Sequence, residues 1–294
     1  RGQRFCSKRC YAIHQAVSQR GYDLDESFFE RNDTTTAYWA GLLVADGYVT
    51  HLAHSTRLTL TLKSEDEPHL HSWLNAISIP ESAHQVYHRG GRSDARVSSP
   101  FIRPSLVRWG LIPRKTYALR NIPSLWSNPD LIPHFIRGLW DGDGHIRFGR
   151  NPEGCMTMQM GLISSSWIID WLVEMLQGWH IKHIRYDRKP TILEDGTIYT
   201  VSRIVVSRQD DMVSLVQRLG YLDPTLPALP RKRKSAIDIR DWVERESVGP
   251  DRTCTRCGSS YTVRGNYPHS RYCSSRCRET SRNERRRLSR RSAA

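Results

Sequence analysis

An internal duplication limits the possible folds of this chain more than any other feature of its sequence. Residues 38–49, YWAGLLVADGYV, align with residues 135–146, FIRGLWDGDGHI, at an offset of 97. In each copy a strand-like alternation follows, at 57–62 and 157–162, and then an amphipathic helical pattern, at 69–77 and 167–176. Both copies end in Pro-Arg-Lys, at 113–115 and 230–232. The sequence therefore predicts an α+β fold of two pseudo-symmetric αββαββα repeats, at 31–125 and 126–245.

Small residues lie four positions apart in each repeated helix, Gly41 with Ala45 and Gly138 with Gly142. Positions four apart stack on one face of a helix, so two such helices can bring their backbones together. Glycine inside a helix costs about 1 kcal/mol relative to alanine, so this pattern needs a packing reason. We expect the two repeats to dock on each other through these helices.

Each repeated helix ends with an aspartate followed by glycine, Asp46 in the first copy and Asp143 in the second. If the helices pair, both carboxylates and the free carbonyls of the helix ends lie together, where the helix dipole is negative. Such hard oxygen ligands suit Mg²⁺, which keeps some of its waters and bridges to phosphate. An isolated Asp-Gly is commonly no more than a turn, but the duplication predicts that Asp46 and Asp143 hold Mg²⁺.

The two motifs resemble those of the LAGLIDADG homing endonucleases in their single-chain, two-motif form. The resemblance covers residues 35–236 and is strongest in GLWDGDG at 138–144; in the weaker GLLVADG at 41–47, Val44 replaces a frequent aspartate. It implies a saddle of two halves in which each sheet reads a half-site in the DNA major groove. It also implies a monomer that hydrolyses both strands across the minor groove and leaves short 3′ overhangs.

The resemblance further implies a basic residue near each active site. The Pro-Arg-Lys repeats nominate Lys115 and Lys232, which would polarise the attacking water or offset developing charge. Both lysines could instead contact phosphates or simply be solvated. Asp141 is expected to point away from the metal, since it lies two residues from Asp143 on a helix, and to pair with Arg137, one turn earlier.

Polar positions on the predicted strands are the candidates for reading bases. In the first repeat, Arg57, Thr59 and Thr61 share one face opposite three leucines. In the second repeat, the candidates are Thr157, Gln159, Arg185, Arg188 and Arg203. Arginine prefers guanine and glutamine prefers adenine in the major groove. We expect segment 84–97, which contains Arg89 and Arg92, to be a loop that follows phosphates.

The charge of the chain points to a polyanionic partner, which the resemblance implies is double-stranded DNA or, for a maturase, the RNA of a host intron. The net charge is +14 and the pI is about 9.8, and residues 251–294 carry twelve arginines against three acids. A basic end is often only a solvated tail, but this one adjoins a cysteine cluster. No apolar run approaches 18 residues and no segment resembles a signal peptide. We therefore expect a cytoplasmic protein, neither secreted nor membrane-spanning.

Four cysteines, Cys254, Cys257, Cys273 and Cys277, form two close pairs separated by a short loop, which is the spacing of zinc ligands. Disulfides are the alternative, but thiols stay reduced inside cells. The sequence therefore predicts a structural zinc finger at 246–280, followed by an arginine-rich tail at 281–294.

The N-terminal segment, 1–30, contains a partial copy of this finger. RFCSKRC at 4–10 matches RYCSSRC at 271–277, so Cys6 and Cys10 resemble the second half of a finger whose first cysteine pair would precede Arg1. Two thiolates alone are a poor zinc site, so this half is either incomplete or completed by another ligand. His14 is a candidate, although a surface histidine is the simpler interpretation. Zinc modules on both flanks would lengthen the DNA footprint through phosphate or base contacts.

Two other functions are compatible with the same scaffold. A regulator that binds DNA without cutting it would be expected to lack one or both motif acids, and both are present. A maturase that helps an intron RNA to fold would use the same basic surface. A purely structural zinc protein would leave the duplicated acids unexplained. Site-specific, metal-dependent cleavage of double-stranded DNA is therefore the predicted function.

Overall fold

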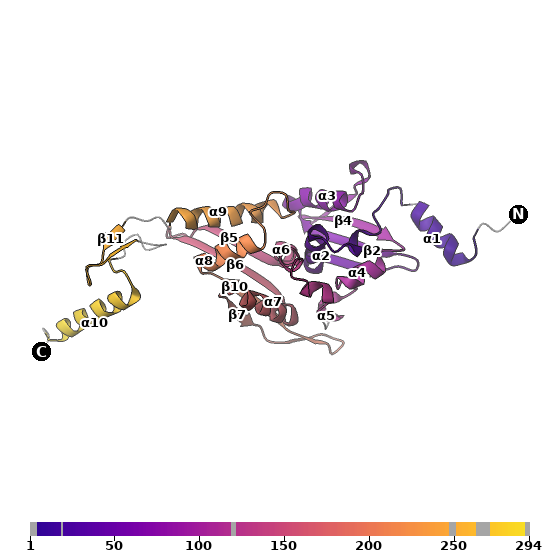
Figure 1. Ribbon diagram of the computed structural model, residues 1–294. Helices are drawn as coiled ribbons and strands as arrows, with labels where there is room; N and C mark the ends of the chain where they lie inside the picture. The colour runs from indigo at the N-terminus through magenta and orange to yellow at the C-terminus, as the bar shows by residue number, and fades with distance from the viewer. Residues whose placement is uncertain (1–4, 19, 119–121, 247–250, 263–270, 292–294) are drawn as a thin grey trace.

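Two repeats with the predicted element order form the body of the molecule. The computed structural model describes residues 5–18, 20–118, 122–246, 251–262 and 271–291. Each repeat has a four-stranded antiparallel sheet, ordered β1-β2-β4-β3 in the first and β5-β6-β10-β7 in the second. The equivalent strand orders confirm the predicted α+β duplication (Figure 1).

The first repeat consists of α2 (Thr34–Asp46), β1 (Gly47–His51), β2 (Thr56–Lys63), α3 (Glu67–Ala76), β3 (Val86–Arg89), β4 (Arg92–Ser99), α4 (Arg103–Arg108) and the short α5 (Lys115–Ala118). Segment 84–97, which was expected to be a loop, is instead a hairpin of β3 and β4. Its turn residues Gly90 and Gly91 have φ values of +56° and +76°. A tight hairpin turn requires these left-handed values, and glycine adopts them without strain.

The second repeat consists of α6 (Ile132–Asp143), β5 (Gly144–Arg150), β6 (Met156–Ser165), α7 (Ser166–Gly178), β7 (Ile184–Asp187), β10 (Val201–Val206), α8 (Gln209–Arg218) and α9 (Pro230–Glu246). A small hairpin of β8 (Thr191–Ile192) and β9 (Ile198–Tyr199) is inserted between β7 and β10. In the first repeat, only the two-glycine turn connects the equivalent strands β3 and β4.

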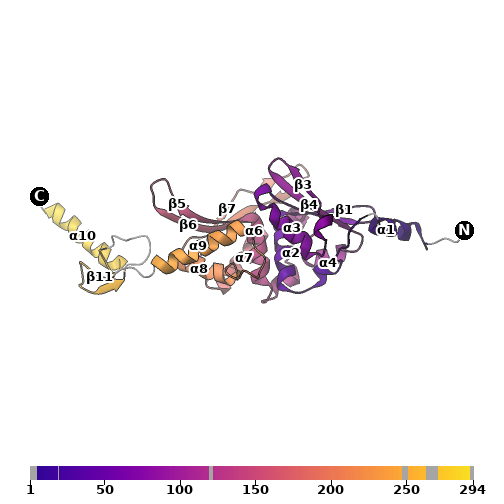
Figure 2. The ribbon, with the colours of Figure 1, turned by 90° about the horizontal axis from the view of Figure 1, so that it is seen from above.

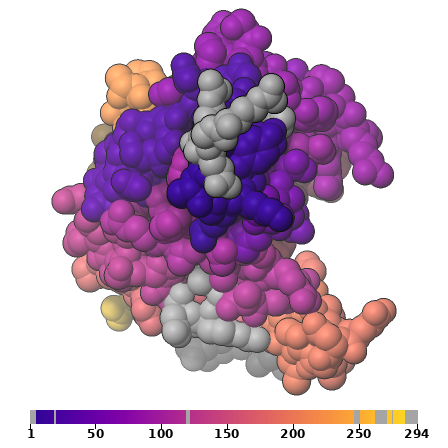
Figure 3. Space-filling view, turned by 90° about the vertical axis from the view of Figure 1, so that its right-hand side faces the viewer, coloured from indigo at the N-terminus to yellow at the C-terminus, as the bar shows by residue number. Residues whose placement is uncertain are grey.

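Side-chain alternation decides which face of each sheet meets the core. In β2, Leu58, Leu60 and Leu62 are buried, whereas the residues between them are partly or fully exposed. The helices cover this apolar face, so the strands lie on one side of the molecule and the helices on the other (Figure 2). On the strand side the molecule is hollowed between a purple projection of the first repeat and an orange projection of the second (Figure 3).

The segments outside the repeats differ from the predicted boundaries at two places. Leu24, Phe28 and Phe29 lie in the predicted N-terminal segment but are buried in the core of the first repeat. At the other end, α10 (Ser275–Arg291) runs from the cysteine cluster into the predicted tail, so the arginine-rich residues continue the helix that contains Cys277. The remaining elements are α1 (Lys8–Ser18), β11 (Asp251–Thr253) and β12 (Ser260–Thr262). None of the described helices is long and apolar enough to cross a membrane.

Candidate active site and DNA interface

Helices α2 and α6 lie side by side at the centre of the molecule with their backbones in contact (Figure 1). A β-carbon on Gly41 would lie 2.0 Å from the carbonyl oxygen of Phe135 in α6. A β-carbon on Gly138 would lie 2.0 Å from the carbonyl oxygen of Tyr38 in α2. Glycine alone fits at these two positions, so the predicted docking of the repeats through these helices is confirmed.

This packing brings together the C-terminal ends of the two helices. Asp46 is the last residue of α2, and Asp143 is the last residue of α6. A β-carbon on Gly142 would lie 2.2 Å from Ala45 Cβ and 3.1 Å from Asp46 Oδ2. The Asp46 carboxylate therefore lies against the last turn of α6, the turn that ends at Asp143.

The surroundings raise the pKa of both carboxylates. Loss of hydration raises the pKa of Asp46, against the opposing effects of Lys232 and then Lys115. Solvent reaches Asp143 from one side, but loss of hydration and then the negative charge of Asp46 raise the pKa of Asp143 to about 6. A bound cation would relieve this repulsion between the two carboxylates.

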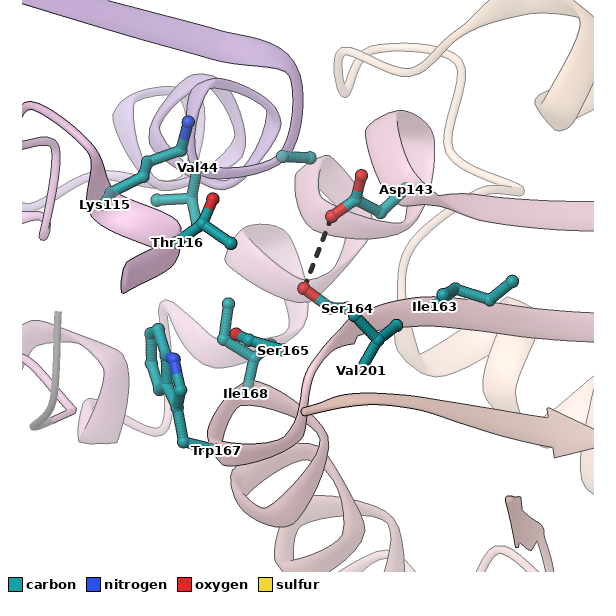
Figure 4. Close-up of a pocket in the computed structure, with 11 residues that line it drawn as sticks. Val44, Lys115, Thr116, Asp143, Ile163, Ser164, Ser165, Trp167, Ile168 and Val201 are labelled. Carbon is teal, nitrogen blue, oxygen red and sulfur yellow. Dashed lines mark hydrogen bonds between the residues drawn. The ribbon is translucent and has the colours of Figure 1, made fainter. Parts of the chain in front are cut away.

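A pocket of about 240 Å³ opens beside Asp143, between the two repeats (Figure 4). Lys115 lines one side of it, and Ser164 lies across the pocket, where its hydroxyl donates to Asp143 Oδ2 at 3.4 Å. Two buried atoms of the lining residues, Ser165 Oγ and Trp167 Nε1, find no hydrogen-bond partner among the described residues. This pocket therefore combines a carboxylate, an ammonium group and two polar atoms without partners.

A second pocket, of about 440 Å³, opens beside Asp46 and is bordered by the first sheet. Arg92 from β4 and Arg231 from the start of α9 line it together with Asp66. Asp66 is 5% exposed and accepts hydrogen bonds from Arg231 Nε at 3.0 and 2.9 Å. The two aspartates of the motifs thus face two different pockets, each with its own basic side chains.

Lys115, which the sequence nominated for catalysis, reaches the first pocket. Its Nζ donates to the Gly47 carbonyl at the end of α2. Burial lowers the pKa of Lys115, while Asp143 and then Asp46 oppose that shift. The ammonium therefore lies close enough to both motif acids to interact with their charges.

Lys232, the other nominated lysine, lies inside the protein. It is 2% exposed, and its Nζ donates to the carbonyl oxygens of Trp140 at 2.8 Å, of Gly144 at 2.7 Å and of Asp141. Burial lowers the pKa of Lys232 to about 8, which still leaves it charged at neutral pH. Lys232 thus caps the end of α6, so the carbonyls there are not free for a metal as the sequence pattern predicts.

Asp141 is buried, but its partner is not Arg137, which corrects the expected ion pair. The Asp141 carboxylate accepts hydrogen bonds from Tyr38 Oη at 2.8 Å, Tyr221 Oη at 2.7 Å and the Leu229 amide at 2.7 Å. Arg137 donates instead to backbone carbonyls of the second repeat. Asp141 therefore holds the core of the molecule together around α6.

The outer face of the first sheet carries Arg57, Thr59 and Thr61, where the alternation placed them. β4 pairs with β2 so that Arg96 lies opposite Thr59 and joins this face. Arg96 was not predicted, because its segment was expected to be a loop; the alternation of residues 92–99 was the missed signal. Arg89 and Arg92, both predicted, are exposed at the hairpin end of β3 and β4.

The outer face of the second sheet carries Thr157, Gln159 and Arg203. Arg203 Nη2 donates to Gln159 Oε1 at 2.8 Å, and His145 Nε2 lies 3.1 Å from the same oxygen. Arg147 of β5, which is not among the predicted DNA contacts, lies opposite Gln159 and is exposed. The pairing of β5 with β6, which no local pattern reveals, places Arg147 and His145 on this face.

Arg185 lies on the opposite, helix-covered face, which corrects its predicted role in DNA contact. It pairs across the strands with Ile204, which is fully buried. Its guanidinium forms ion pairs with Asp170 of α7 and, at 2.8 Å, with Asp187. Arg188, another predicted contact, lies just beyond the end of β7 and is exposed.

The four C-terminal cysteines converge as zinc ligands would. Their Sγ atoms all lie within 4.8 Å of one another, with 3.5 Å between Cys257 and Cys273 and 3.7 Å between Cys273 and Cys277. Four thiolates at about 2.3 Å from a tetrahedral zinc ion would stand about 3.8 Å apart. The donor set therefore fits zinc.

The N-terminal cysteines, Cys6 and Cys10, have Sγ atoms 2.9 Å apart at the start of α1. Within the described ranges, the only cluster of three or more potential metal ligands is the C-terminal one, so this pair has no third ligand there. His14, the suggested ligand, packs against Phe5, with 4.9 Å between ring centroids.

No model of a protein family matches the sequence, and no curated protein is significantly similar to it. In structure the chain is similar to LAGLIDADG meganuclease I-AabMI bound to uncleaved DNA, with 12% identity and a TM-score of 0.47, over 73% of this chain and 92% of that one. I-CpaMI bound to uncleaved DNA gives 10% identity and a TM-score of 0.46, over 71% and 92%. I-DmoI with nicked target DNA and manganese gives 16% identity and a TM-score of 0.40, over 69% and 99%.

Proposed function

We propose that this protein is a metal-dependent endonuclease that cuts both strands of a long double-stranded DNA site. The observation that carries the proposal is the meeting of Asp46 and Asp143 at adjacent helix ends, each beside its own pocket. The two acids lie between two equivalent sheets, which provides one acid for each strand of a duplex. The motif resemblance to the LAGLIDADG endonucleases supports the same function, in a monomer acting wherever its target genome lies.

The residues at the two helix ends fit Mg²⁺. Asp46 and Asp143 offer hard carboxylate oxygens, and within the part of the chain that the structure describes neither belongs to a cluster of three or more potential metal ligands. The remaining positions would go to water and phosphate, as Mg²⁺ prefers. Bound at the carboxylates, divalent ions would supply an activated water and stabilise the leaving oxygen.

The other side chains would orient and hold the DNA. Lys115 would orient the attacking water or offset charge on the phosphate beside Asp143, since its ammonium lines that pocket. The polar outer faces of the two sheets, with Arg57 and Arg203 as leading examples, would contact base edges in the two half-sites. The net charge of +14 would draw the phosphate backbone into the hollow of Figure 3.

A cleavage assay on a randomised duplex library with Mg²⁺ tests this function. We expect the parent protein to cut both strands at one long site, and Asp46→Asn and Asp143→Asn each to abolish double-strand cutting. Asp130→Asn, an exposed acid at the start of the second repeat, is the matched control and should cut normally. Tight binding of duplex DNA without cutting would contradict the proposal and indicate a regulator. A footprint on intron RNA in place of DNA would indicate a maturase.

We further propose that the cysteine module binds structural zinc and extends the footprint at one end of the site. α10 begins within the cysteine cluster, with Cys277 in its first turn, and carries most of the C-terminal arginines, which would add phosphate contacts. Replacing Cys254 and Cys273 with serine should shorten the DNA footprint on that flank. An unchanged footprint would remove this role while leaving the nuclease proposal intact.

A further inference from the structure

The two Pro-Arg-Lys segments, 113–115 and 230–232, are equivalent in sequence but present different side chains to the two aspartates. Each lysine donates to the carbonyl of the glycine that follows its own repeat's aspartate, Lys115 to Gly47 and Lys232 to Gly144. The two segments are therefore equivalently placed, and the difference between them lies in the surrounding side chains.

In the first segment the lysine faces the active-site pocket and the arginine leaves it. Lys115 lines the pocket that contains Asp143. Arg114 turns outward, where its Nη2 pairs with Asp195 in the turn of the β8–β9 hairpin at 3.1 Å and the side chain is 66% exposed. An ammonium group is therefore the cation of the Asp143 pocket.

In the second segment these positions are exchanged. Lys232 is almost completely buried, and the three N–H donors of its Nζ are shared among four backbone carbonyls, those of Trp140, Asp141, Gly142 and Gly144, so none is left for a ligand. Arg231 instead lines the pocket that contains Asp46, and its side chain is 41% exposed. The arginine is thus the reachable member of this segment.

Asp66 of the first repeat fixes the direction of Arg231. The buried carboxylate of Asp66 accepts from Arg231 Nε and lies 2.9 Å from its Nη2, and within the described ranges Nη1 makes no hydrogen bond. A guanidinium held along one edge keeps its remaining donors in a fixed orientation, and these donors match the oxygens of a phosphate. Arg92 lines the same pocket, but no hydrogen bond within those ranges fixes its side chain.

We propose that Arg231, and not Lys232, contacts the scissile phosphate at the Asp46 site, and that Asp66 is the positioning residue that aims it. This inference rests on the proposed function and makes the two sites chemically unlike. An ammonium group would contact the scissile phosphate at Asp143, and a guanidinium group would contact the one at Asp46. Because a guanidinium keeps its proton, Arg231 would stabilise charge on the phosphate and would not act as a base.

Strand-specific cleavage of the duplex recovered from the library tests the assignment. Arg231→Gln should slow cutting of one strand by about 10²-fold or more and leave the other near the parent rate. Lys115→Met should slow the opposite strand, and Asp66→Asn should give a smaller loss on the same strand as Arg231→Gln. Arg231→Lys should restore part of the rate. Arg240→Gln, which removes a charge from the same helix outside both pockets, is the control.

Equal slowing of both strands by Arg231→Gln would show a structural role and overturn the proposal, as would parent-like rates on both. Since loss of Arg231 leaves Asp66 buried without its partner, the double variant Arg231→Gln with Asp66→Asn provides a version with a neutral pair. The double variant should be as stable as the parent and should still be slow in cutting that one strand only. A parent that cuts no duplex would instead contradict the proposed function.

A binding measurement tests the phosphate contact without any cleavage. On random-sequence duplex in EDTA, the slope of log affinity against log salt concentration should shrink by about 0.9 in Arg231→Gln, since one phosphate contact is lost. The slope should stay unchanged in Arg240→Gln. A parent that binds while Arg231→Gln keeps the full slope would overturn the assignment of Arg231 alone.

Discussion

Gly138 lies so close to Tyr38 that a β-carbon on the glycine would stand 2.0 Å from the tyrosine carbonyl oxygen. The pseudo-symmetric contact, Gly41 against the Phe135 carbonyl, has the same separation. The two repeats therefore meet backbone to backbone, and this contact sets where Asp46 and Asp143 lie. Any side chain at either glycine must push the two helices apart.

We expect Gly138→Ala to lower the free energy of unfolding by about 3 kcal/mol or more, because the added methyl meets backbone and not a movable side chain. Urea denaturation provides the measurement. Gly149→Ala in β5 is the control, since a β-carbon there would meet nothing within 4 Å. Equal stability of the two variants would show that α2 and α6 can move apart without loss of stability.

The repeats and their docking could be predicted because each depends on a local pattern that occurs twice. Gly41, Gly138 and the two Asp-Gly helix ends lie in the duplicated segment itself, and the period-2 alternation of β2 reports its buried face directly. Fold and candidate acids therefore followed from the sequence without any knowledge of long-range pairing.

The residues around the acids could not be predicted in the same way, since strand register and burial decide their roles. Arg185 and Arg203 are both arginines in strands of the second repeat, yet pairing with the buried Ile204 puts Arg185 on the helix face. Lys115 and Lys232 stand in identical tripeptides, but only Lys232 is enclosed by the end of α6. Tertiary contacts alone distinguish the members of each pair.

Lys232→Met should destabilise the protein by about 3 kcal/mol or more. The substitution leaves the Trp140, Asp141 and Gly144 carbonyls without their shared donor, and each buried acceptor without a partner costs about 1–3 kcal/mol. Lys234→Met, two residues away with a side chain that is 76% exposed, should change stability by less than about 0.5 kcal/mol. Thermal unfolding of both variants compares them, and a Lys232→Met protein as stable as the control would show that Lys232 does not act as a cap.

Metal analysis of the purified chain should find one zinc ion. Cys277→Ser should lose it, since that thiol belongs to the cluster of four, whereas Cys6→Ser should retain it. Loss of zinc should also unfold the segment that contains β11 and β12, because structural zinc supplies the folding energy of small modules. Two zinc ions per chain, with one lost in Cys6→Ser, would show instead that the N-terminal pair is a site.

Arg203→Ala should weaken binding to the target duplex by about 1–3 kcal/mol and relax the choice of base at one position. Arg203 lies on the outer face, where its Nη2 donates to Gln159 Oε1 at 2.8 Å, so the two side chains can contact a base edge together. Arg185→Ala should leave affinity unchanged, since its guanidinium is paired with Asp170 and Asp187 on the helix side. Competition binding measures both, and the reverse ranking would mean that the other sheet face meets DNA.

The raised pKa of Asp143 makes stability depend on pH and on metal. Its pKa is about 6 in the folded protein against 3.8 as the ordinary value, so the folded state binds this proton more tightly. As pH rises from about 4 to 6, the group therefore contributes a growing penalty to stability, which is complete above about 6.

We expect Asp143→Asn to raise the melting temperature of the metal-free protein at pH 7.5 and to have little effect near pH 4. Added Mg²⁺ should stabilise the parent more than the variant, because the ion offsets the same carboxylate charge. Asp130→Asn, at an exposed site, should show neither behaviour. An equal effect of Asp143→Asn at both pH values would mean that the surroundings of Asp143 do not raise its pKa.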